Sequence, residues 1–174
     1  MSNFEQFNFK PYINEALMEK GFNQPTEVQE RLIPLIAKGK NIIGQSQTGS
    51  GKTHTFLLPL FQKINAEKAE VQVVITAPSR ELATQIYEAA NQIAKFSTPE
   101  IRVTNFVGGT DKQRQLNRLN HQQPHIVVGH ALKQFGEPVD SLLPMRLGQQ
   151  ALEKFRQYND IYQIAGATFL SGNI

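Results

Sequence analysis

Apolar side chains recur along the chain in two alternating patterns, one with the period of a helix and the other with that of a strand. Helical spacing predicts helices near residues 12–21, 26–36, 53–65, 80–96 and 111–119, and Thr26 and Gln29 have the spacing of a capping box. Short β-branched runs predict strands at residues 42–43, 71–77, 101–107 and 125–129. Because helices separate the strands, we expect an α/β fold in which helices cover both faces of a parallel sheet.

Length and composition are those of one soluble domain. The chain has 174 residues, of which 40% are hydrophobic and 19% charged, and this size suffices to bury a core. A net charge of +3 permits contact with a polyanion without requiring it. The sequence contains no cysteine, which excludes disulfides and thiolate metal sites. Without a leader-like N-terminus or an apolar run approaching ~18 residues, we expect a cytoplasmic protein with no membrane contact.

A glycine-rich segment follows the predicted strand at 42–43 and opens the next predicted helix. It reads Ser46-Gln47-Thr48-Gly49-Ser50-Gly51-Lys52-Thr53. The two glycines allow backbone N–H groups to turn toward phosphate oxygens, and the helix N-terminus favours the same anion. In such a cradle Lys52 reaches the β- and γ-phosphates, and the Thr53 hydroxyl is a ligand for Mg²⁺. The segment therefore predicts a triphosphate site, although Ser46 replaces the first glycine of the strict motif. The alternative is a loop that merely contains Gly-Ser-Gly-Lys.

A second informative stretch runs Gly21-Phe22-Asn23-Gln24-Pro25-Thr26-Glu27-Val28-Gln29, and Phe4 lies 17 residues before its first glycine. A glutamine amide can pair with the edge of adenine and reject guanine, while an aromatic ring can stack on the base. Taken alone, a glutamine such as Gln29 is more often a residue on the surface of a helix. Placed upstream of a phosphate loop, the stretch resembles the Q motif of DEAD-box RNA helicases.

Over about residues 4–129 the chain resembles the N-terminal RecA-like domain of that family. The resemblance implies that ATP and Mg²⁺ are the cofactors and that RNA is a partner. It also implies that Phe4 stacks on adenine and that Gln29 reads its edge. The nucleotide site would be completed by Phe22, by the cradle residues Ser46, Gln47, Thr48, Gly49, Ser50, Gly51, Lys52 and Thr53, and by Thr55.

Two further segments follow in the order of the family. Residues 77–85 resemble motif Ia, with Ser79 in place of the usual threonine, and Val107-Gly108-Gly109-Thr110 resembles the GG element. The resemblance implies that RNA phosphates are bound by Pro78, Ser79, Arg80, Gly108 and Gly109. Considered alone, the first segment is more often a capped helix start with an Arg–Glu pair, and the second is a turn. Lys112, Arg114 and Arg118 add charge that is either solvated or held against RNA.

The resemblance ends at about residue 129, which suggests a division into 1–129 and 130–174. His130-Ala131-Leu132-Lys133 stands where the family has Thr-Pro-Gly-Arg, and no Asp-Glu-Ala-Asp follows. The family uses that acidic cluster to hold metal and align the attacking water. The second RecA-like domain, with its arginine fingers, has no counterpart in this sequence. Either the tail supplies a replacement strand beside residues 42–43, or the sheet is incomplete.

These patterns leave two functions in competition. The first is the ATP-binding half of an RNA helicase that turns over little by itself. The second is a non-enzymatic adenine-nucleotide or RNA-binding module, or a truncated helicase fragment. A small-molecule P-loop kinase is disfavoured, because it has no use for the Gln29 stretch. Without carboxylate partners, His121, His125 and His130 are predicted to be structural or solvated rather than metal ligands.

Overall fold

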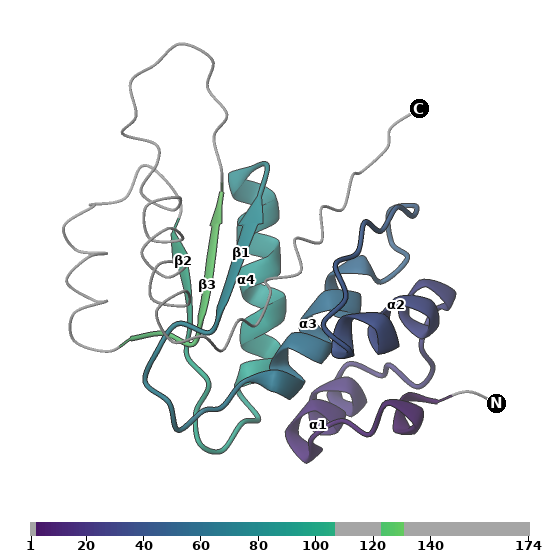
Figure 1. Ribbon diagram of the computed structural model, residues 1–174, viewed down its shortest axis with the longest axis horizontal. Helices are drawn as coiled ribbons and strands as arrows, with labels where there is room; N and C mark the ends of the chain where they lie inside the picture. Colours follow the sequence, from purple (N-terminus) through teal and green to yellow (C-terminus); the bar gives the residue numbers. More distant parts are fainter. Residues whose placement is uncertain (1–2, 107–122, 131–174) are drawn as a thin grey trace, which may run out of the picture.

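The computed structural model describes residues 3–106 and 123–130 (Figure 1). The elements in chain order are η1 (Phe4–Phe7), α1 (Pro11–Glu19), α2 (Glu27–Ala37), α3 (Lys52–Lys63), β1 (Val73–Ala77), α4 (Arg80–Ala94), β2 (Val103–Phe106) and β3 (Ile126–His130). They confirm the helices and strands predicted from the sequence in these ranges, with one exception at residues 42–43. The helix expected at 111–119 lies outside the described residues.

The three described strands form one parallel sheet with the order β1-β3-β2. β3 is central and pairs with both neighbours, so that Val73 and Val103 both align with Ile126. Ile126, Val127 and Val128 are buried, as expected of the central strand of a parallel sheet. Since the strands are parallel, their carboxyl ends meet at one edge, where the segment from residue 77 onward leaves β1.

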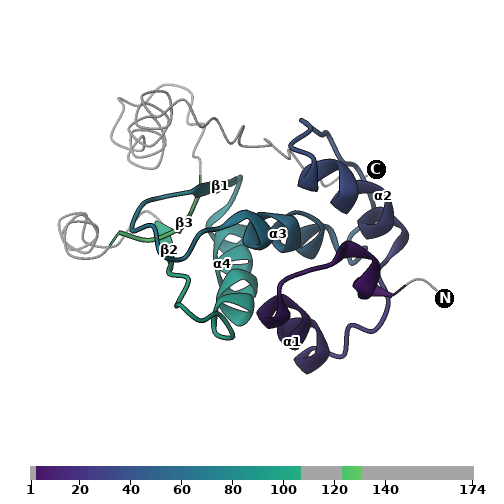
Figure 2. The same cartoon turned by 60° about the horizontal axis from the view of Figure 1, so that its bottom comes forward.

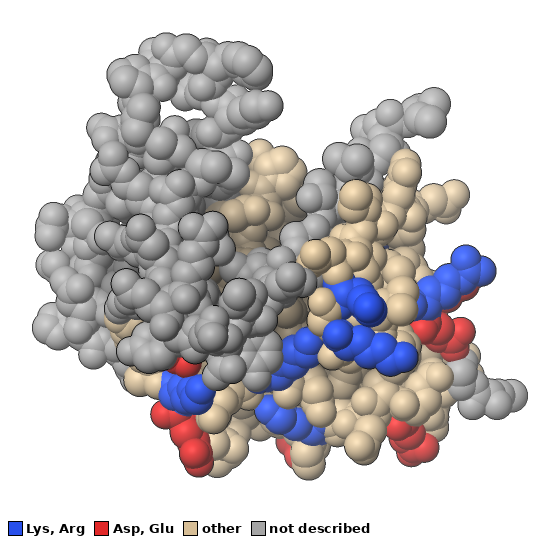
Figure 3. Space-filling view, in the orientation of Figure 1, with Lys and Arg blue, Asp and Glu red and all other residues tan. Residues whose placement is uncertain are grey.

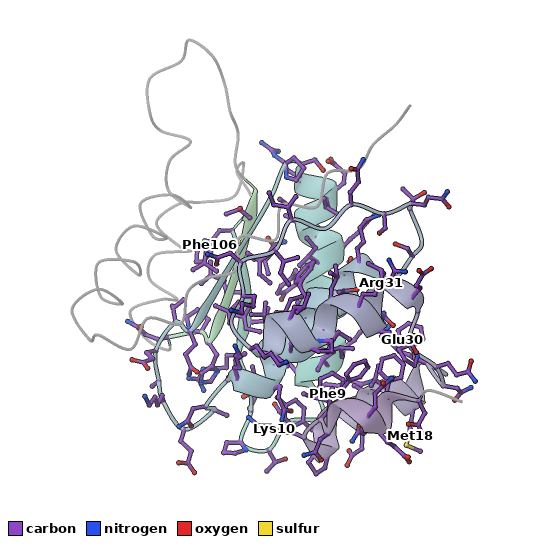
Figure 4. The ribbon with its side chains drawn as sticks, turned by 45° about the vertical axis from the view of Figure 1, so that its right-hand side comes forward. Phe9, Lys10, Met18, Glu30, Arg31 and Phe106 are labelled. Carbon is purple, nitrogen blue, oxygen red and sulfur yellow. The ribbon has the colours of Figure 1, made fainter. Side chains whose placement is uncertain are left out.

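Helix α4 lies along the sheet and contacts all three strands, and α1 and α3 pack against α4 (Figures 1 and 2). The buried faces of these helices are apolar, with Ala83, Ile86 and Ala90 on α4. Phe9 lies inward, whereas Met18 projects from the outer side of α1 (Figure 4). The fold class is confirmed. Helical cover of the second face of the sheet stays a prediction.

The strand predicted at residues 42–43 is wrong. Residues 41–47 have no regular secondary structure, and Ile43 is 82% exposed. None of the three described strands pairs with this segment, since β1 and β2 each pair with β3 alone within the described residues. An extended segment without a partner leaves its backbone polar groups unpaired, so the β-branched residues here do not form a strand.

His125 has the structural role that its sequence context predicted. Its side chain is fully buried, and its Nδ1 accepts a hydrogen bond from the backbone N–H of Arg102 at 2.9 Å. Burial first, and then the charge of Arg102, lower the pKa of the imidazole, which keeps the ring neutral.

The described residues include no group of three or more potential His, Cys, Asp or Glu metal ligands. The described helices are all too short or too polar to cross a membrane.

Candidate nucleotide-binding site

The cradle predicted from the sequence is a glycine turn that leads directly into a helix. Gly49 and Gly51 have φ angles of +80° and +85°, in the region that side chains rarely adopt, and α3 begins at Lys52. A Cβ atom on Gly51 would lie 2.6 Å from Nε2 of Gln29, so no larger residue fits without displacing that amide. The backbone angle therefore favours glycine at this position, and any side chain here would move the Gln29 amide.

The ammonium group of Lys52 folds back onto its own loop. Its Nζ donates hydrogen bonds to the carbonyl oxygens of Ser46 and Gln47, and the hydroxyls of Ser46 and Ser50 are 2.6 Å apart. The charge is thus held at the centre of the turn by neutral carbonyl groups. A phosphate oxygen is a stronger partner for an ammonium than a carbonyl, because the bond is assisted by charge on both sides. Lys52 can exchange these carbonyls for an anion.

The two stretches singled out in the sequence meet in space. The predicted capping box is confirmed, with the Thr26 hydroxyl and the Gln29 side chain each bonded to the backbone of the other. The same two side chains reach the cradle. Thr26 Oγ1 donates to the carbonyl oxygen of Ser50 at 2.8 Å, and Gln29 Nε2 donates to that of Gly51 at 3.2 Å. The start of α2 is therefore tied to the glycine turn at two adjacent residues.

An aromatic pair lies at the first turn of α3. The ring of Phe22 contacts that of His54 edge-on, with centroids 5.0 Å apart and planes at 87°. The ammonium of Lys20 is 6.0 Å from the Phe22 centroid. Burial, and then the charge of Lys20, lower the pKa of His54 to about 4. Sequence reasoning included Phe22 but missed His54. Its position directly after Lys52 and Thr53 was the available signal.

Three residues predicted to bind nucleotide are buried. Phe4 is 7% exposed and packs in the core, with its ring 6.1 Å from that of Phe7. Stacking on a base therefore requires η1 to uncover one face of this ring. Gln29 is 4% exposed. Thr55 is fully buried, and its hydroxyl donates to the carbonyl of Gly51 at 3.0 Å. Their contacts with a nucleotide, like those of the other predicted site residues, stay predictions.

The predicted RNA-contacting segment lies at the carboxyl end of β1. The Ser79 hydroxyl accepts a hydrogen bond from the backbone N–H of Leu82 at 3.2 Å, so it caps α4. Pro78 and Arg80 are exposed beside it. Gly108, Gly109 and the predicted basic helix that follows them lie outside the described residues.

Positive charge gathers across the face that α2 and α3 present in Figure 3. Lys63 Nζ donates to the carbonyl of Ile36 at the end of α2, and Lys10 Nζ donates to the carbonyl of Ile64 after α3. These two ammonium groups therefore neutralise helix carboxyl ends and are held in place. Glu30 and Arg31 lie on the outer side of α2 (Figure 4), where Arg31 pairs with Glu27 at 2.7 Å.

Comparison with protein families gives one match, to the DEAD/DEAH box helicase model, over residues 26–139. This match includes the last four residues of the Gln29 stretch, the cradle and all three described strands. The chain belongs to the DEAD/DEAH box helicase family. Its membership confirms the resemblance inferred from the Gln29 stretch and the phosphate loop.

Curated relatives from the family are similar over most of this chain. The DEAD-box ATP-dependent RNA helicase CshB of Listeria monocytogenes is 58% identical over 128 residues, which cover 74% of this chain and 29% of that protein. CshB of Bacillus subtilis is 53% identical over 127 residues, 72% of this chain and 29% of the relative. The chain thus spans less than a third of the length of these relatives.

Solved structures of the family share the fold. A DEAD box protein from the hyperthermophile Methanococcus jannaschii has a TM-score of 0.74 and 24% identity, covering all of this chain and 51% of that one. Mss116p bound to ssRNA and AMP-PNP has a TM-score of 0.64 and 31% identity, covering 74% of this chain and 27% of that one. The fold is therefore that of DEAD-box RecA-like domains.

Proposed function

We propose that this chain is the ATP-binding part of a DEAD-box RNA helicase, in which the start of α2 selects adenine and the turn before α3 holds the phosphates. The observation that carries the proposal is the pair of hydrogen bonds from Thr26 and Gln29 to Ser50 and Gly51. A side chain suited to reading a base is thereby fixed beside a turn suited to holding phosphate. A glutamine at the start of a helix does not need a glycine turn beside it, and a glycine turn does not need a glutamine. Their direct contact therefore supports a shared ligand.

The residues of the cradle fit a nucleotide triphosphate with Mg²⁺. The backbone angle of +85° at Gly51 lets the turn bend directly before α3, so that its N–H groups could face an anion. Lys52 would supply the counter-charge, and the N-terminus of α3 would add its dipole. Thr53 would offer one hydroxyl oxygen to the metal. Mg²⁺ retains waters and takes its remaining ligands from phosphates, so one protein ligand suffices.

The residues that we assign to catalysis, Lys52 and Thr53, belong to the same cradle. Lys52 and Thr53 would neutralise and orient the phosphates, which stabilises charge that spreads over the transferred group. ATP hydrolysis also needs a group that orients the attacking water. The family also uses arginine fingers from a second RecA-like domain. Since residues 130–174 do not contain the acidic motif, we propose that this chain by itself binds ATP but hydrolyses it negligibly.

RNA binding is the second part of the proposal. The exposed Arg80, the backbone at the start of α4 and Gly108-Gly109 would hold the phosphate backbone, so binding would not depend on base sequence. One structural relative, Mss116p, is described as bound to ssRNA. The alternative, a binding module without enzymatic activity, is favoured by the absence of the acidic motif from the sequence.

Phosphate release tests whether this chain turns over ATP, and titration of a triphosphate tests the cradle. Steady-state release from ATP should be measured for the purified chain and for Lys52→Ala, with and without single-stranded RNA. We expect negligible release from both proteins and loss of triphosphate binding in the variant. RNA-stimulated release that Lys52→Ala abolishes would show that the chain is a complete ATPase. Equal triphosphate binding by the two proteins would overturn the cradle assignment.

A further inference from the structure

Phe22 is an exposed ring next to the cradle. It is 38% exposed, and it is the one aromatic residue among the exposed large hydrophobic residues of the described chain. The ring touches His54, the third residue of α3, two positions from Lys52. Because ribose joins a nucleotide base to its phosphates, a base must lie close to the edge of the cradle. Phe4 is buried in the core, so Phe22 is the exposed aromatic ring that the contact with His54 places beside the cradle.

His54 holds this ring from the side of the core. The two rings meet at 87°, the edge-to-face arrangement that aromatic pairs prefer. The imidazole is neutral at neutral pH, because burial and then Lys20 lower its pKa to about 4. Its Nε2 is buried and has no hydrogen-bond partner among the described residues. A ring that is neutral and enclosed in this way can act through its packing against Phe22.

We propose that His54 is a positioning residue for base recognition, which holds Phe22 in the orientation that stacks on the base of a nucleoside di- or triphosphate. The inference rests on the proposed function, since it requires phosphates at Lys52. Without His54 the Phe22 ring would rotate among its rotamers, and ordering it on binding would cost conformational entropy. With His54 the ring is ordered in advance.

His54 and Gln29 would act on different parts of the base, so the loss of each should change the affinities for different ligands. Stacking acts on the face of any base, whereas the amide of Gln29 acts on the edge of one base. Loss of His54 should therefore weaken ADP and GDP by similar factors. It should leave tripolyphosphate, which has no base, unaffected. A residue that merely stabilised the cradle would weaken all three ligands.

The test is calorimetric titration of ADP, GDP and tripolyphosphate into the full chain and its variants. We expect His54→Ala to weaken ADP and GDP about two- to tenfold, the range of an aromatic pair, with tripolyphosphate unchanged. His54→Leu fills the volume without an aromatic edge and should act likewise, which protects the test if the alanine variant unfolds. His54→Phe keeps the edge-to-face contact and should bind ADP as the wild type does.

Two controls complete the design. Phe96→Ala removes a half-buried ring at the end of α4, far along the chain from the cradle, and should leave all three affinities unchanged. In the Phe22→Ala background, His54→Ala should have no further effect on ADP. Additive losses in the double variant, equal losses of ADP and tripolyphosphate, or failure of His54→Phe to restore binding would each overturn the inference. A wild-type chain that binds none of the ligands would instead overturn the proposed function, and with it this inference.

Discussion

The side-chain amide of Gln29 donates a hydrogen bond to the carbonyl oxygen of Gly51 across 3.2 Å, while its own oxygen accepts from the backbone N–H of Thr26 at 2.9 Å. Both ends of the amide are thus used within the protein. An amide nitrogen carries two N–H donors and its oxygen two lone pairs, so Gln29 can keep both bonds and still has one N–H and one lone pair for a base. The two bonds fix the amide between the cradle and the start of α2, so base recognition and phosphate binding depend on one side chain.

Replacing Gly51 should break this connection. In Gly51→Ala the new Cβ would lie 2.6 Å from Nε2 of Gln29, in a residue whose φ is +85°. We expect lost stability of about 1–2 kcal/mol from the backbone angle, with a further loss of nucleotide affinity from the displaced amide. Gly49→Ala is the matched control, because its φ is +80° but its Cβ would meet nothing within 4 Å. Urea denaturation and ADP titration of both variants would compare these costs. Equal effects would show that the Gln29 contact is unimportant.

The charge of Lys20 should be visible in the titration of His54. Lys20 is the second cause, after burial, that lowers the pKa of this imidazole to about 4. In Lys20→Met the pKa of His54 should therefore rise toward 6.5, as followed by NMR of the ring protons. The unfolded chain binds more protons than the folded one between about pH 6.5 and pH 4. Stability should consequently fall as the pH falls through this window, and less steeply in Lys20→Met. An unchanged pKa in the variant would contradict this account.

His125 should be a stability residue. In His125→Leu the backbone N–H of Arg102 loses its acceptor inside the protein, which should cost about 1–3 kcal/mol in the free energy of unfolding. His125→Asn retains an acceptor atom near the position of Nδ1 and should recover part of the loss. Chemical denaturation monitored by circular dichroism measures both. If the two variants were as stable as the wild type, the contact with Arg102 would have no structural role.

RNA binding should respond to Arg80 in a sequence-independent way. Arg80→Ala removes an exposed guanidinium from the start of α4, and we expect weaker binding to all single strands alike, with the salt slope reduced by about one. Arg31→Ala removes an equal charge from the outer side of α2 and is the control. Fluorescence polarisation at two salt concentrations makes the comparison. Tight, sequence-selective and salt-insensitive binding would contradict a phosphate-gripping surface.

The sequence predicted those features that depend on residues close together in the chain, such as helix caps. The capping box of Thr26 and Gln29 and the helix start at Ser79 each depend on residues three apart, and both are confirmed. The strand at residues 42–43 failed because a strand needs a partner, which β-branched residues cannot specify alone. The contact between Phe22 and His54 joins two distant segments through tertiary packing, so the position of His54 after Lys52 and Thr53 could mark it as a site residue but could not indicate its partner.

The most direct test of the account is the ratio of ATP to GTP affinity in the wild type and in two variants of Gln29. Gln29→Ala removes both ends of the amide, and Gln29→Glu keeps the acceptor for Thr26 but loses the donor to Gly51. If Gln29 selects adenine, the wild type should prefer ATP, and Gln29→Ala should weaken ATP by about 1–3 kcal/mol, with a smaller effect on GTP. Gln29→Glu should also lose the preference. Equal affinity of the wild type for ATP and GTP would contradict the central claim.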